Sequence, residues 1–131
     1  MWCNRRALPV YYTYVPNKKK WEKVLKEYSL GDIPFPETAA RCTTFTNEVT
    51  GETLCLVTVN RKKCKTLLEI TGVLAHEAYH VFYSNIEAMG EESPSEEFSA
   101  YSIQFIYQNL FERYLKCHKL KSLLSENIDE S

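Results

Sequence analysis

The stretch that decides the fold is residues 66–90, which read TLLEITGVLAHEAYHVFYSNIEAMG. Apolar residues recur in it at the three- and four-residue spacing of a helix, and Gly90 supplies a stop. The sequence therefore predicts a long helix from Thr66 to Met89. Because this helix is apolar almost all round, we expect it to lie in the middle of the domain.

The residues that precede this helix contain three strand-like segments. Residues 10–15, 40–47 and 52–60 are rich in β-branched and aromatic side chains, and the polar stretch around Thr50-Gly51 predicts that the last two form a hairpin. The segment 52–60 is the most apolar of them. This pattern suits an edge strand on which an extended peptide adds a further strand, and it suits a buried central strand equally well.

Two further helices are predicted, one on each side of the long one. Asn17 is a typical N-cap for a helix over 18–30. After the long helix, Ser93 and Glu96 have the spacing of a capping box, with Pro94 in the first helical position. This last helix is expected to run to about Lys116. The order of elements predicts an α+β fold, with a short antiparallel sheet packed on the central helix.

The length and composition predict one small globular domain over residues 1–131, with a polar tail from about Ser122. No apolar run is long enough to span a membrane, and no secretory leader pattern is present. Sixteen Lys and Arg residues oppose 17 Asp and Glu residues, so a nucleic-acid partner is not expected. The five cysteines include no close pair, which indicates reduced thiols and a cytoplasmic location.

The residues that indicate a chemistry are His76-Glu77-Ala78-Tyr79-His80, an H-E-x-x-H pattern inside the long helix. Residues four apart on a helix project from nearly the same face, so both imidazoles can reach one metal ion. Glu77 is placed about 100° around the helix, beside the ion. This spacing is typical of zinc hydrolases, in which the carboxylate takes a proton from a water molecule at the ion.

A catalytic zinc site needs a third protein ligand and one open position. Glu69 and Glu87 lie two turns away along the same helix, roughly 10 Å from the imidazoles, and are too distant. We choose Glu97, because it shares a helix face with Ala100, a small residue that would let two helices approach closely. Three other acidic residues before and at the start of this helix remain alternatives: Glu91, Glu92 and Glu96.

The segment from Val73 to Tyr101 resembles the gluzincin branch of the zincin metallopeptidases, which have an H-E-x-x-H helix and a second helix with a glutamate in an E-x-x-A context. The size and the strand, helix and hairpin order also resemble small stand-alone zincin-like proteins of bacteria and their phages. The resemblance implies a Zn²⁺ site with His76, His80 and Glu97 as ligands. It also implies that Glu77 is the general base.

The expected function is therefore a zinc-dependent hydrolase that acts on a protein or peptide substrate. The alternatives are a zinc-binding, zincin-like interaction module with little or no catalysis, and a helical interaction protein in which the motif is accidental. Peptide hydrolysis also needs a group that stabilises the oxyanion besides the metal. The sequence leaves five candidates for that role: Tyr83, Tyr101, Tyr107, Arg41 and His118.

Overall fold

The computed structural model describes residues 1–120, so the predicted polar tail from about Ser122 lies outside the described residues. Six elements follow one another along the described chain. They are β1 (Tyr11–Tyr14), α1 (Lys18–Glu27), β2 (Ala40–Thr46), β3 (Thr53–Val59), α2 (Leu67–Met89) and α3 (Glu96–Cys117). These elements confirm the α+β class and the predicted order.

The sheet has three strands in the order β1-β3-β2, and it is mixed. β2 and β3 form the predicted antiparallel hairpin, with Thr43 opposite Leu56. β1 pairs in parallel with β3, with Thr13 also opposite Leu56. The prediction of a purely antiparallel sheet was wrong in this respect. The chain crosses over through α1 and β2 before it returns as β3, which gives the two strands the same direction.

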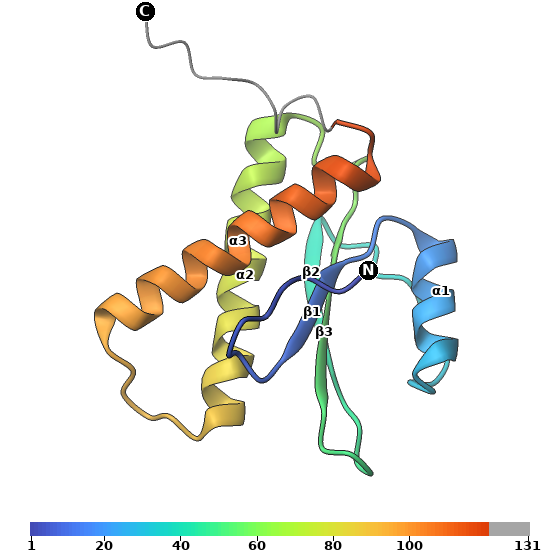
Figure 1. The fold of residues 1–131 in the computed structure, drawn as a ribbon. Coiled ribbons are helices and arrows are strands. Elements are labelled where there is room, and N and C mark those ends of the chain that lie inside the picture. The colour runs from blue at the N-terminus through green and yellow to red at the C-terminus, as the bar shows by residue number, and fades with distance from the viewer. Residues whose placement is uncertain (121–131) are drawn as a thin grey trace, which may run out of the picture.

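Helices cover both faces of this sheet. α2 and α3 lie on one face and α1 lies on the other, as Figure 1 shows. Cys55 and Val57 of β3 are part of the core beneath α2 and α3, whereas Leu56 packs with Trp21 and Val24 of α1. Because β3 is the central strand and is buried on both faces, it is an almost unbroken run of apolar residues.

Both ends of α2 lie where the sequence predicts them. The Thr66 hydroxyl accepts a hydrogen bond from the backbone N–H of Glu69, and the Glu69 carboxylate accepts one from the Thr66 N–H, which completes a capping box. Gly90 ends the helix in the left-handed conformation, with φ of 68°. Although its sequence is apolar almost all round, α2 leaves one face in solvent, where Tyr79 and Tyr83 are each 52% exposed.

The start of α3 differs from the prediction. Its N-cap is Ser95, whose hydroxyl accepts a hydrogen bond from the N–H of Phe98, so the proposed capping box at Ser93 does not form. The buried face of α3 begins at Ser102 and continues four residues at a time along the helix, through Ile106, Leu110 and Tyr114. Ala100 is exposed and does not bring α3 close to α2.

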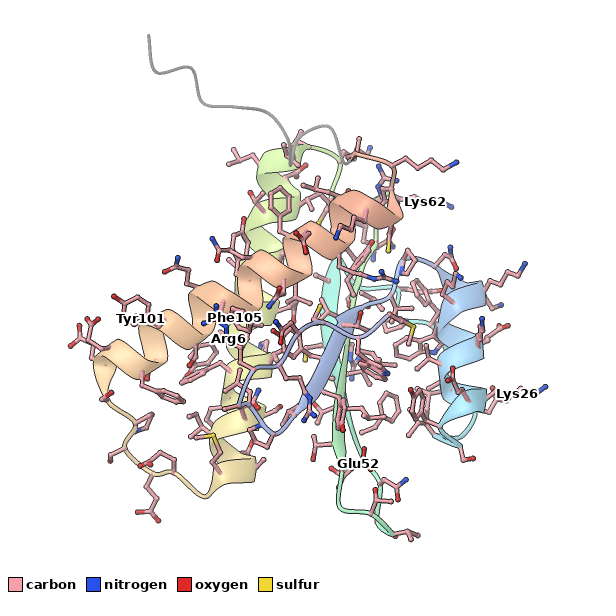
Figure 2. The ribbon with its side chains drawn as sticks, viewed as in Figure 1. Arg6, Lys26, Glu52, Lys62, Tyr101 and Phe105 are labelled. Carbon is pink, nitrogen blue, oxygen red and sulfur yellow. The ribbon has the colours of Figure 1, made fainter. Side chains whose placement is uncertain are left out.

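The segment before β1 is held against both long helices. The Asn85 side chain, fully buried on α2, accepts a hydrogen bond from the Val10 N–H at 2.9 Å and donates one to the Val81 carbonyl. Arg6 lies over the ring of Phe105 on α3, with the guanidinium carbon 4.0 Å from the ring centroid (Figure 2).

Among residues 1–120, no helix combines the length and hydropathy needed to cross a bilayer.

Candidate metal centre

His76 and His80 lie in the middle of α2 and point to one place. Their Nε2 atoms are 3.2 Å apart, and their ring centroids are 5.0 Å apart. Both side chains are exposed to solvent. The helix places them one turn apart on the same face, as the H-E-x-x-H spacing predicts. The capping box at the start of α2 and the left-handed Gly90 at its end help keep this helix regular.

Glu77 completes the group from the buried side of the helix. The potential ligand atoms of His76, Glu77 and His80 all lie within 4.8 Å of one another. Glu77 is only 5% exposed. Burial raises the pKa of its carboxyl, and the two imidazoles and a backbone hydrogen bond from Cys42 partly offset this effect. A carboxylate with a raised pKa takes up a proton more readily than an ordinary surface glutamate.

The group opens into a shallow cleft of about 310 Å³ between α2 and β2. Thr38, Ala40, Arg41 and Cys42 line the cleft opposite the three α2 residues. β2 is an edge strand, since the sheet order places only β3 beside it. The sequence left open whether the segment 52–60 is an edge strand or a buried central strand. It forms β3, the central strand of the sheet.

Glu97 is not brought to the two imidazoles. It is exposed in the first turn of α3, and no group of potential ligands found in residues 1–120 includes it. The face of α3 that packs inward passes through Ser102 and Ile106, so Glu97 is directed away from that contact. Its role as a third ligand stays a sequence prediction without support from the geometry. Glu91, Glu92 and Glu96 are likewise absent from the group.

Of the five candidates for oxyanion stabilisation, only Arg41 lines the cleft. The ring nitrogens of His118 instead contact the Tyr14 hydroxyl at 2.7 Å and the Arg61 guanidinium at 3.0 Å. Tyr101 lines a separate cavity beside Arg6 and Phe105.

Cys42 is a cleft residue that the sequence did not single out. The neighbouring Cys55 thiol and burial raise the pKa of the Cys42 thiol. Cys42 and Ala40 are two apart on β2, so they share the face of the strand that lies against α2. That alternation is the signal from which Cys42 could have been found, once β2 was known to lie beside the H-E-x-x-H helix.

Comparison of the chain with models of protein families, with curated proteins and with solved structures finds no match.

Proposed function

We propose that this protein is a zincin-like, zinc-dependent hydrolase that cleaves peptides. The observation that carries the proposal is the convergence of the His76 and His80 Nε2 atoms to 3.2 Å, with the Glu77 carboxylate beside them. Two nitrogens bound to one tetrahedral zinc ion, each about 2.0–2.1 Å from it, would be about 3.3 Å apart. The side chains therefore have the separation that one shared ion requires.

The donor set also suits zinc. Neutral imidazole nitrogens and carboxylate oxygens are common zinc ligands, and the exposed side of the histidine pair leaves room for a substrate. A bound zinc ion would supply a Lewis acid and lower the pKa of a water molecule in the cleft. Glu77 is positioned to take a proton and to pass it on to the leaving group. Its burial favours that role, because burial raises the proton affinity of its carboxylate.

The cleft also contains features that would hold an extended peptide. β2 offers backbone N–H and C=O groups along its outer edge, where a peptide can add a strand. Such a peptide would run past His76 and His80, which line the same cleft as Ala40 and Cys42. Arg41 lines the same cleft, although strand alternation directs its side chain to the face of β2 opposite Ala40 and Cys42. To bring its charge toward an oxyanion on the scissile carbonyl, the guanidinium would have to reach around the free edge of β2.

One observation favours a second candidate function, a zinc-binding module with little or no catalysis. Glu77 offers an oxygen within 4.8 Å of both imidazole nitrogens, and Glu97 does not join the group. If Glu77 is itself the third ligand, it is not free to act as a base. The two functions differ in the role of one carboxylate, which makes them separable by experiment.

The test compares Glu77→Gln with Glu87→Gln, a matched change on the exposed part of the same helix. Zinc content is measured by elemental analysis, and cleavage of a mixed peptide library is followed by mass spectrometry at neutral pH. A hydrolase in which Glu77 is the base predicts that Glu77→Gln keeps zinc and loses about 10²–10⁴-fold in cleavage rate. Glu87→Gln should match wild type in both measurements.

Two outcomes would contradict the hydrolase. Loss of zinc in Glu77→Gln, without cleavage by the zinc-loaded wild type, would show that Glu77 is a ligand in a binding module. Equal cleavage by wild type and Glu77→Gln would show that Glu77 is not the base.

A further inference from the structure

A second cavity lies beside β1, at the opposite edge of the sheet from β2, and the proposed zinc centre does not use it. It has a volume of about 510 Å³ and is formed by α1, the first residues of the chain and the last turns of α3. This volume falls in the range of sites that enclose small molecules, about 300–1,000 Å³. The larger of the two sites therefore lies away from the H-E-x-x-H group.

Positive charge dominates the lining of this cavity. Lys20 and Lys23 come from α1 and Arg113 comes from α3, whereas Glu27 is the only acidic residue in the lining. Three cations against one carboxylate leave two positive charges uncompensated. The ion pairs formed within residues 1–120 are Lys18–Glu22 and Lys116–Glu112, and neither involves these three cations.

Arg113 carries the most specific signal. Its Nε atom is buried, and no hydrogen-bond partner for it exists among the described residues. Buried donors in native proteins are almost always paired with protein, water or a ligand. A guanidinium offers two parallel N–H groups to a phosphate or carboxylate, and its Nε–H is often one of them. Because no protein acceptor holds the Arg113 guanidinium at this atom, the group remains available to an anion that enters the cavity.

The start of α1 adds to the positive electrostatic potential of the cavity. Asn17, the N-cap residue, lines the cavity, and the first turn of α1 contains no acidic residue that would oppose the positive end of the helix. The Lys20 N–H is already bonded to the Asn17 side chain at 2.9 Å, so the helix contributes through the positive end of its dipole and not through a free N–H of Lys20.

Two aromatic side chains lie beside the cations in this cavity. Trp2 and Tyr28 both line the cavity, with their ring centroids 5.5 Å apart in an edge-to-face arrangement. The indole Nε1–H of Trp2 donates a hydrogen bond to the Tyr28 hydroxyl at 2.8 Å, which fixes the two rings relative to each other. Fixed aromatic rings of this kind bind flat heterocycles by stacking or by edge contact.

We propose that this cavity binds a small phosphorylated molecule with a planar ring, of the size and charge of a nucleoside monophosphate. A phosphate monoester carries about −1.5 to −2 charge at neutral pH, which balances the two uncompensated positive charges better than a single carboxylate does. Lys20, Lys23 and Arg113 hold the phosphate, and the ring lies against Trp2 and Tyr28.

The test is a titration of the full chain with AMP, adenosine and inorganic phosphate, measured by calorimetry and by tryptophan fluorescence. Trp2 lines the cavity, whereas Trp21 is fully buried in the core between α1 and the sheet. AMP should bind saturably at one site per chain and change the fluorescence, and Trp2→Phe should abolish that change. Adenosine and inorganic phosphate should each bind at least about tenfold more weakly, because each lacks one half of the recognised group.

Charge variants provide the matched control. Lys20→Gln and Arg113→Gln should each weaken AMP binding about tenfold or more, as expected for hydrogen bonds to a charged group. Lys19→Gln removes the same charge from the same turn but outside the cavity lining, so it should change affinity less than about twofold. Lys26, which points away from the molecule in Figure 2, gives a second control. If Arg113→Gln does not fold, the same loss of AMP affinity is measured in Lys20→Gln and Lys23→Gln.

Three results would overturn the proposal. The first is the absence of saturable binding at millimolar AMP. The second is equal weakening by Lys19→Gln and Lys20→Gln, which would reduce the effect to general surface charge. The third is that adenosine or phosphate alone binds as well as AMP. None of these results bears on the zinc centre.

Discussion

The Nε2 atoms of His76 and His80 are 3.2 Å apart, close enough to bind the same metal ion. We therefore propose these two histidines as the nitrogen ligands of the site. We expect about one zinc per chain in wild type, and loss of stoichiometric zinc in His80→Ala. Glu97→Ala should bind zinc as wild type does, because Glu97 is outside the ligand group. Zinc affinity is measured by competition with a chelator, with Glu96→Ala as the neighbouring control.

A loss of affinity confined to Glu97→Ala would contradict this expectation. It would restore the ligand assignment made from the sequence, and it would require α3 to lie closer to α2 in the zinc-bound protein.

The sequence predicted the part of this site that depends on one helix. The positions of His76, Glu77 and His80 follow from a spacing of four residues, which any regular helix converts into a shared face. The third ligand depends instead on how α2 and α3 cross, and crossing angles are set by side-chain packing along both helices. The choice of Glu97 assumed that Ala100 lies in that contact, but Ala100 is exposed and the contact passes through Ser102.

At the scale of the elements, the two serines before α3 offer a direct check of where that helix begins. Ser95→Ala removes the hydroxyl that accepts the Phe98 N–H and should cost about 1 kcal/mol of unfolding free energy. Ser93→Ala removes a hydroxyl that caps no helix and should change stability by less than about 0.5 kcal/mol. Urea unfolding of both variants measures the difference. The reverse order of the two costs would place the N-cap at Ser93.

The C-terminal end of α3 should make stability depend on pH. The Arg61 guanidinium donates to Nδ1 of His118, so Nε2 bears the ring proton and donates it to the Tyr14 hydroxyl. Burial and the nearby charge of Arg61 lower the pKa of His118 below its usual range. The folded state therefore favours neutral His118, and the unfolded chain binds a proton first as the pH falls.

This stabilisation is fully present above the unfolded pKa of about 6.5 and is lost as the pH falls through the lower folded value. The thermal midpoint of wild type should therefore decrease between neutral pH and mildly acidic pH more than that of His118→Gln, in which the amide can replace both hydrogen bonds without titrating. Parallel pH profiles for the two proteins would mean that His118 has no depressed pKa.

The elements themselves were largely predictable, whereas their pairing was not. Asn17, Thr66 and Gly90 mark helix ends through hydrogen bonds and backbone conformations that are local in the chain. The parallel pairing of β1 with β3 depends on a crossover through two other elements, and alternation within a strand carries no information about the direction of its partner.

At the scale of the whole molecule, Asn85 joins the first strand region to the central helix. Asn85→Ala would leave the buried Val10 N–H without an acceptor, which typically costs about 1–3 kcal/mol. Gln108→Ala, an exposed change on α3, should stay within about 0.5 kcal/mol of wild type. Urea unfolding gives both values. A cost for Asn85→Ala no larger than that for Gln108→Ala would mean that this hydrogen bond does not hold the segment in place.

The parallel pairing of β1 with β3 also has a consequence for the order of folding events. The β2–β3 hairpin closes a short loop, whereas β1 must find a partner across the whole of α1 and β2. Closing the longer loop costs more chain entropy, so β1 is expected to dock after the hairpin and α2 have met. Interactions that form after the rate-limiting step change the unfolding rate and leave the folding rate nearly unchanged. Asn85→Ala should therefore shorten the lifetime of the native protein, seen as a raised unfolding arm in stopped-flow measurements, while the refolding arm stays where it is in wild type.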